Sequence, residues 1–150
     1  MIFFAETFDA KNLTEITLKS KKFWGYSEKQ LENWTDELTV SEQMIQKLIV
    51  YKYIYDDKII GFYILNQPQE KFIELEFLFV LPAFIGKGIG NQLIQHAFSE
   101  AIKLGCSQIH LLADPNAVPF YHSKGFVIID EKESVVFGRF LPVMQKDLTG

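Results

Sequence analysis

The chain has 150 residues, which is about the length of one domain and leaves no room for a second core. Hydrophobic residues make up 48% of the sequence and aromatic residues 15%, a composition that supports a sizeable core and argues against disorder. The formal net charge is −4 and no cluster of Lys or Arg stands out, so a nucleic-acid partner is not expected. The one cysteine, Cys106, excludes an intrachain disulfide, and we interpret it as a small core or loop residue.

The sequence also lacks the features of a secreted or membrane protein. Residues 1–12 have neither the basic start nor the continuous apolar stretch of a signal peptide. No apolar run reaches the length that a helix needs to span a bilayer. We therefore expect a cytoplasmic protein with no membrane partner.

The first part of the chain predicts a strand followed by short helices. Residues 1–7 form an apolar run typical of a strand, and Asp9 is placed to cap the helix that follows. Ser27 has Gln30 three residues later, which is the spacing of a capping box and predicts the start of another helix. Ser41 predicts a third, shorter helical turn.

The pattern then changes to that of three consecutive strands. Residues 48–55 and 58–65 flank the turn Asp56–Asp57, and this arrangement predicts a β-hairpin. After a break at Pro68, residues 71–80 read as a long third strand. The three strands together predict an antiparallel meander.

An amphipathic helix is predicted after the meander, because apolar residues recur every three or four positions from Ile89 onward. Gly105 is placed to end this helix in the left-handed conformation. The rest of the chain predicts a buried strand, a short helix and two closing strands, at residues 107–113, 114–124, 126–130 and 135–144. This order predicts an α/β fold with a mixed, largely antiparallel sheet of about seven strands, covered by helices on both faces, in one domain spanning residues 1–150.

The segment from Leu81 to Gly90 is the most informative part of the sequence. It follows a strand and opens a helix, whose first N–H groups are unpaired and carry a partial positive charge. Gly86, Gly88 and Gly90 lack the Cβ atoms that would keep a phosphate away from these groups. The segment therefore predicts a phosphate or pyrophosphate site, although a glycine-rich loop that only turns the chain would look similar.

Two better-known phosphate loops fit this segment poorly. A P-loop needs Ser or Thr after its Gly-Lys pair, whereas Gly86 and Lys87 are followed by Gly88. A dinucleotide-binding turn follows the first strand of a parallel βαβ unit, whereas these glycines follow an antiparallel meander. A nucleotide-binding enzyme is therefore disfavoured.

Pro82 to Leu93 resembles the acetyl-CoA loop of the GNAT superfamily of acetyltransferases, whose pattern is Arg/Gln-x-x-Gly-x-Gly/Ala. Gly88 and Gly90 match its two small positions, and Ile85 departs from it by standing where Arg or Gln is usual. The family loop works mainly through backbone N–H groups, so the departure leaves the chemistry of the loop intact. The resemblance implies that acetyl-CoA is held by this loop and by backbone groups of the strand before it, at Phe79, Val80, Ile85, Gly86, Lys87, Gly88, Ile89 and Gly90.

A second resemblance to the same family lies downstream. Asn116 to Phe126 resembles the family segment Asn-x-x-Ala-x-x-Phe-Tyr-x-x-x-Gly-Phe, with Pro119 where Ala is common. It implies that Asn116 and Phe120 contact the cofactor and that Tyr121 protonates the leaving thiolate. The simpler readings are a helix N-cap for Asn116 and a buried aromatic for Tyr121. Residues 23–27 and 138–144 are also similar to one uncharacterised bacterial branch of the family.

The candidates for the general base, which would deprotonate the acceptor ammonium, are carboxylates on the third strand of the meander. Glu74 and Glu76 lie two residues apart, so their side chains share one face of that strand. A carboxylate facing a cleft, with a raised pKa, could deprotonate an ammonium directly or through water. We favour Glu76, which is closer to the glycine loop, and a solvent-exposed edge remains the alternative for both residues.

Acceptor and metal sites are less clearly marked. The family resemblance implies that Trp24 and Tyr26 line the acceptor pocket, and an aromatic pair that closes a helical junction is the alternative. The three histidines are not spaced as metal ligands, and His96 reads as a residue on the helix surface.

On this resemblance the chain is identified as a GNAT-fold N-acetyltransferase. It is expected to move an acetyl group from acetyl-CoA directly to a small-molecule or peptide amine, in a ternary complex and without a metal. Homodimers are common in the family. The alternative is a non-catalytic module that binds CoA or acyl-CoA as a sensor or partner protein, which the departure at Ile85 leaves open.

Overall fold

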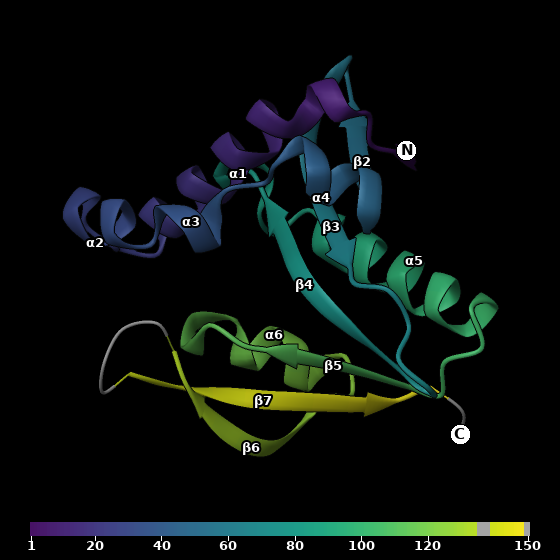
Figure 1. Ribbon diagram of the computed structural model, residues 1–150. Coiled ribbons are helices and arrows are strands. Elements are labelled where there is room, and N and C mark those ends of the chain that lie inside the picture. The colour runs from purple at the N-terminus through teal and green to yellow at the C-terminus, as the bar shows by residue number, and fades with distance from the viewer. Residues whose placement is uncertain (135–138, 149–150) are drawn as a thin grey trace. The chain divides into compact units, whose positions relative to one another are not determined.

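The computed structural model describes residues 1–134 and 139–148 (Figure 1). Its elements in chain order are β1 (Ile2–Phe4), η1 (Thr7–Asp9), α1 (Ala10–Phe23), α2 (Glu28–Asn33), α3 (Thr35–Leu38), α4 (Glu42–Lys47), β2 (Ile49–Tyr55), β3 (Lys58–Leu65), β4 (Phe72–Val80), η2 (Pro82–Phe84), α5 (Ile89–Lys103), β5 (Gln108–Leu112), η3 (Pro115–Ala117), α6 (Val118–Ser123), β6 (Val127–Glu133) and β7 (Phe140–Asp147). No helix among these residues is long and apolar enough to cross a membrane.

The strands of the described residues form a seven-stranded sheet in the order β1-β2-β3-β4-β5-β7-β6. β1 with β2, β2 with β3, β5 with β7 and β6 with β7 are antiparallel, and β4 pairs with β5 in parallel. The predicted fold class, a largely antiparallel mixed sheet with helices, is confirmed. The predicted hairpin is confirmed as well, with Asp56 and Asp57 in the left-handed region at φ of 52° and 60°.

The chain divides into two compact units. The first contains residues 1–65 and 77–97, and the second contains residues 66–76 and 98–150. β4 and α5 each contribute residues to both units.

The first unit has its core between α1 and the β2–β3 hairpin. One stripe of α1, which includes Leu13 and Ile16, packs against Val50, Phe62 and Ile64 of the hairpin. All five side chains are almost completely buried. The α1 helix therefore follows from its apolar periodicity, and burial of this stripe stabilises it.

Two of the three predicted helix caps are confirmed. Ser27 accepts a hydrogen bond from the backbone N–H of Gln30 at 3.1 Å, and the Gln30 side chain accepts one from Ser27 N–H in return. Ser41 accepts a hydrogen bond from Met44 N–H at the start of α4. Both short helices are therefore fixed at their first turn by local side chains.

The predicted cap at Asp9 is wrong. Asp9 precedes α1, but its side chain makes no cap hydrogen bond to that helix. Its carboxylate accepts hydrogen bonds from Glu6 N–H and from Lys52 Nζ of β2, both at 2.7 Å. The Asp9 and Lys52 side chains are only 6% and 11% exposed, so the Asp9 carboxylate forms a buried ion pair in place of the predicted cap.

The second unit is built on β5, β6 and β7, which Figure 1 shows together with α6. Its core contains Ile109, Met144 and Phe126, each fully buried, and Cys106 is buried as predicted. β6 continues to Glu133 and β7 runs to Asp147, so both closing strands end three residues later than predicted. Part of the last predicted strand, residues 135–138, lies outside the described residues.

Candidate functional site

The glycine loop connects β4 to α5 within the first unit. After the 3-10 turn η2, Gly86 and Gly88 adopt φ of 83° and 82°, and α5 begins at Ile89. Residues with a side chain rarely adopt this left-handed conformation, which explains why glycine occupies both positions. An ideal Cβ placed on either residue meets nothing within 4 Å, so the backbone faces open space.

This open backbone fits a diphosphate. Gly90 and the N–H groups of the first turn of α5 follow directly, and such groups at a helix N-terminus attract anions. Lys87 is exposed in the same loop and adds a positive charge. The residues present therefore match the diphosphate of coenzyme A in charge and in hydrogen-bond donors.

Neighbouring strands fix both ends of the loop. Leu81 N–H donates to the carbonyl of Ile60 at 2.8 Å, and the Tyr53 hydroxyl donates to Gln92 of the first turn of α5 at 3.0 Å. Gly61 allows β4 to approach closely, because an ideal Cβ there would lie 3.0 Å from the carbonyl oxygen of Phe79. The loop is thus hydrogen-bonded to the β2–β3 hairpin at both ends.

The carbonyl of Val80, one of the groups predicted to contact the cofactor, already has a partner. Ser20, a buried residue of α1, donates its hydroxyl to this carbonyl at 2.8 Å. The end of β4 is therefore tied to the last turns of α1. A carbonyl oxygen has two lone pairs, so a second hydrogen bond at Val80 remains open.

Three of the predicted residues come together at the end of α1. The ring centroids of Trp24 and Phe79 lie 6.3 Å apart. The ammonium of Lys21 lies 5.2 Å from the Trp24 ring centroid and 5.6 Å from the centroids of both Tyr26 and Phe79. The sequence did not single out Lys21, since Phe79 is far from it along the chain.

Tyr121 lies in α6 in the second unit and is buried. Its ring makes edge contacts with Phe120 at 5.3 Å and Phe126 at 5.4 Å. The hydroxyl makes no hydrogen bond within the described residues. Burial and the charge of Asp114 raise the pKa of Tyr121, so it holds its proton at neutral pH.

Asn116 is not the N-cap of the following helix, which corrects one alternative reading. Asp114 is the residue that caps η3, because its side chain accepts hydrogen bonds from Asn116 N–H at 2.9 Å and from the Asn116 amide at 3.0 Å. Arg139 lies 3.8 Å from the same carboxylate. Asp114 thus organises the segment that leads to Tyr121, and its position between a strand and Pro115 was the signal for it.

Glu74 and Glu76 lie on β4 in the second unit, with exposed side chains on the same face as predicted. Glu76 accepts a hydrogen bond from the Asn66 amide at 3.1 Å. Partial desolvation, followed by the charge of nearby Glu74, raises the pKa of Glu76 above that of an ordinary glutamate. A carboxylate with a raised pKa accepts a proton more readily than an ordinary glutamate does, which suits a general base.

His96 is not on the helix surface, contrary to the prediction. It is half-buried on α5, and its Nδ1 lies 2.7 Å from the hydroxyl of Tyr63. The Tyr51 ring packs edge-on against it at 4.5 Å. His96 therefore joins α5 to β2 and β3 as a structural residue.

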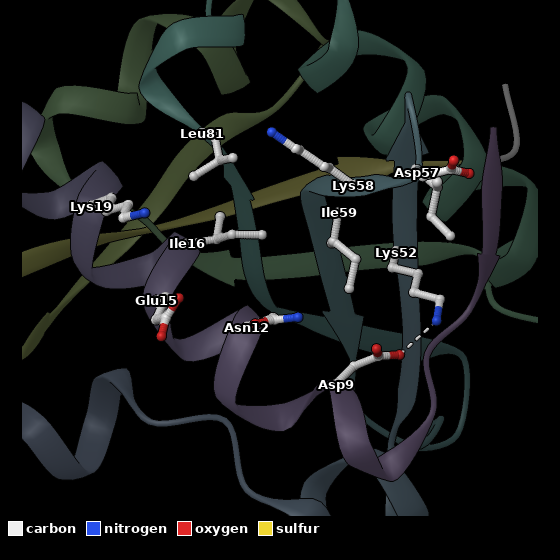
Figure 2. A pocket seen from close by; sticks show the side chains of 11 residues that line it. Asp9, Asn12, Glu15, Ile16, Lys19, Lys52, Asp57, Lys58, Ile59 and Leu81 are labelled. Carbon is white, nitrogen blue, oxygen red and sulfur yellow. Dashed lines mark hydrogen bonds and ion pairs between the residues drawn. The ribbon is translucent and has the colours of Figure 1, made fainter.

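A pocket of about 440 Å³ opens between α1 and the β2–β3 hairpin (Figure 2). Asp9 and Lys52 form their ion pair at its wall, and side chains of both signs surround it. None of the predicted site residues lines this pocket. Leu81, at the start of the glycine segment, lines the pocket, whereas no residue from Ile85 to Gly90 does.

The open glycine backbone gives a direct prediction. Gly88→Ala is expected to weaken CoA binding by tenfold or more, because the added methyl group projects into the space in front of the loop and strains a residue with positive φ by about 1–2 kcal/mol. Gly105→Ala is the matched control, since Gly105 has φ of 85° and equally open space at the other end of α5. Calorimetric titration with CoA should show a loss for the first variant only; equal affinities would contradict the assignment of the loop.

Comparison with known proteins is consistent with these features. The profile of the acetyltransferase (GNAT) domain family matches residues 24–148. A segment of 81 residues is 31% identical to the thialysine N-ε-acetyltransferase of Mus musculus and covers 52% of this chain and 48% of the mouse protein. The match thus spans about half the length of that relative.

Solved structures share the fold over almost the whole chain. The PaiA N-acetyltransferase of Thermoplasma acidophilum, in complex with coenzyme A, has a TM-score of 0.84 at 23% identity, covering 98% of both chains. The ribosomal-protein-S18-alanine N-acetyltransferase of Escherichia coli has a TM-score of 0.74 at 20% identity, covering 100% of this chain and 94% of that one. At these identities the likeness concerns the fold.

Proposed function

Because the chain belongs to the GNAT acetyltransferase family, we propose that it transfers an acetyl group from acetyl-CoA to an amine in a ternary complex. The observation that carries the proposal is the glycine backbone of Gly86 and Gly88, which is open to solvent at the start of α5. Acetyl-CoA is an intracellular metabolite, so the proposal also places the protein in the cytoplasm.

Each step of the transfer has a candidate residue. Acetyl-CoA, when bound, supplies an acetyl group activated as a thioester. The loop from Ile85 to Gly90 holds the diphosphate through backbone N–H groups, with backbone groups of Phe79 and Val80 and the residues Asn116 and Phe120 as further contacts. Tyr121 donates its phenolic proton toward the leaving sulfur.

The proton of the acceptor ammonium goes to Glu76, with Glu74 as the alternative base. The raised pKa of Glu76 supports this choice, because the group then exchanges protons closer to neutral pH than an ordinary glutamate. The charge on the chain also supports a cationic acceptor, since a net charge of −4 attracts amines over short distances.

The aromatic cluster supports an amine as acceptor. Trp24 and Tyr26 were predicted to line the acceptor pocket, and their rings lie around an ammonium group together with Phe79. The mouse relative acts, by its name, on the ε-amine of a lysine analogue. We extend this to the present chain as a proposal: the acceptor is a primary alkylamine.

A CoA-binding module without catalysis is the second candidate. Ile85 favours it, because this 46% exposed apolar side chain provides no charge or hydrogen bond at a position where Arg or Gln is usual. Such a module would bind CoA or acetyl-CoA, and it would leave the thioester of acetyl-CoA intact.

One experiment separates the two candidates. Acetyl-CoA is first titrated calorimetrically, and release of free thiol is then followed over a panel of alkylamines, diamines, amino acids, aminoglycosides and peptides. Binding with thiol release that depends on an amine, together with an acetylated product by mass spectrometry, is the expected result. Binding with no acetylated product on any amine would favour the module, and no binding would overturn both.

The proposed base gives a prediction for the pH dependence. Glu76 acts when deprotonated, so kcat/KM should rise with pH through a value above that of an ordinary glutamate. Glu74→Gln removes a neighbouring negative charge and should shift this rise to lower pH, whereas Glu76→Gln should lower kcat about 100-fold or more and remove the rise. Rate profiles of the three proteins over pH 4–9 test this, and an unchanged profile in Glu76→Gln would rule out Glu76 as the base.

A further inference from the structure

The aromatic cluster at the end of α1 has the chemistry of an ammonium cage. Trp24, Tyr26 and Phe79 come from the end of a helix, the following turn and a strand, and they contact one ammonium, that of Lys21, at 5.2–5.6 Å from their ring centroids. Ring faces within about 6 Å attract a cation through their quadrupoles. A neutral or negative group gains nothing comparable there.

The walls of this cage are held in place by packing. Gly25, with φ of 97°, turns the chain so that Trp24 and Tyr26 both lie beside Lys21. Trp34 packs edge-on against Tyr26 at 5.0 Å, and Phe62 packs against Phe79 at 6.1 Å. The three rings are half-buried, so they are ordered and still border solvent.

We propose that the rings of Trp24, Tyr26 and Phe79 form a binding site for an ammonium group of the acceptor, and that Lys21 occupies this site until the acceptor displaces it. The inference rests on the proposed acetyl transfer. Lys21 shows which ligand fits, because its side chain is an unbranched alkyl chain of four carbons that ends in a primary ammonium.

The cage also constrains the number of amino groups on the acceptor. Contact with the ring faces stabilises the charged form of an amine, whereas the amine that attacks the thioester must be neutral. The ammonium held by the cage is therefore not the one that reacts. The acceptor that fits is an alkyl diamine or a longer polyamine, with one amino group in the cage and another that receives the acetyl group.

Binding to the cage can be measured without acetyl-CoA. The probe is n-butylamine at neutral pH, and n-butanol is its uncharged counterpart. Binding is followed by the indole N–H signal of Trp24 in NMR spectra, which a Trp24→Phe sample assigns. Lys21→Met empties the cage with little change in shape and should tighten butylammonium binding tenfold or more. Lys22→Met is the matched control, since Lys22 is exposed and pairs with Glu28 at 3.2 Å outside the cage.

Removal of a cage wall completes the binding test. Phe79→Leu and Trp24→Leu, each combined with Lys21→Met, should lose the gain in butylammonium affinity, and thermal unfolding shows that each variant is folded. Equal affinity in the wild type, Lys21→Met and Lys22→Met would overturn the proposal. Butanol binding as strong as butylammonium binding would overturn it as well.

The kinetic test compares a diamine with a monoamine of equal length. With 1,4-diaminobutane, Phe79→Leu should raise KM for the diamine about tenfold, and n-butylamine should be a poor substrate of the wild type. Equal kcat/KM for the two amines would overturn the two-amine requirement. If no amine is acetylated, the proposed function fails, and the NMR titration still decides whether the cage binds an ammonium.

Discussion

Tyr121→Phe is expected to lower kcat for acetyl transfer about 100-fold or more while leaving the KM for acetyl-CoA unchanged. The variant removes only the hydroxyl, which makes no hydrogen bond within the described residues. The ring contacts with Phe120 and Phe126 remain, so binding and packing are preserved. Steady-state thiol release measures the rate, and thermal unfolding should show little change.

The pKa of Tyr121 explains why the hydroxyl suits this role. Burial and the neighbouring charge of Asp114 raise the pKa, so the phenol is protonated at every pH at which the enzyme would work. Tyr63→Phe is the control, because Tyr63 is also a buried tyrosine but its hydroxyl contacts His96. That variant should lose about 1 kcal/mol of stability and keep its kcat. If Tyr121→Phe kept its kcat as well, the role of acid would pass to another group.

Lys52→Met is expected to lower the free energy of unfolding by about 3–5 kcal/mol, the largest effect on stability that we predict. The substitution removes one partner of the buried pair and leaves the Asp9 carboxylate, whose side chain is 6% exposed, without its cation. Asp9 lies at the start of α1 and Lys52 lies on β2, so the substitution removes a link between the helix and the hairpin. Urea unfolding at pH 7 measures the change.

A double variant distinguishes the lost pair from lost packing. Asp9→Asn in the Lys52→Met background removes the unpaired charge, and it should recover at least half of the lost stability. Asn keeps a carbonyl oxygen that can accept the Glu6 N–H hydrogen bond. A single variant that lost less than about 1 kcal/mol, or a double variant that was no more stable, would mean that the pair contributes little.

The sequence was sufficient to predict those structural features that depend on residues close together in the chain. Ser27 and Ser41 cap their helices through residues three positions away, and the turn at Asp56 and Asp57 sets the hairpin by its own conformation. The periodicity from Ile89 defined α5 to within a residue at its start. Each of these features depends on residues close together in the chain, so a single sequence contains the information.

The errors came from partners far away in the chain. Asp9 has the residue type of a cap, but Lys52, 43 residues later, competes for its carboxylate. His96 lies at a position that a helical period assigns to solvent, and Tyr63 on β3 holds it instead. The cluster around Lys21 depends on Phe79 in the same way. No pattern among neighbouring residues indicates these contacts, because they form between segments that are far apart in the sequence.

Gly61 has a consequence for how this protein tolerates substitution. Its φ lies outside the left-handed region, so the backbone itself would accept alanine, but an added Cβ would lie 3.0 Å from the Phe79 carbonyl and 3.1 Å from a methyl group of Leu93. The requirement for glycine therefore comes from the neighbours, namely the end of β4 and the helix that follows the cofactor loop. In a complete mutational scan, Gly61 should behave as a position of the binding site, where substitutions reduce activity before they reduce the yield of folded protein. A glycine in the middle of a strand can thus be required for ligand binding without contacting the ligand.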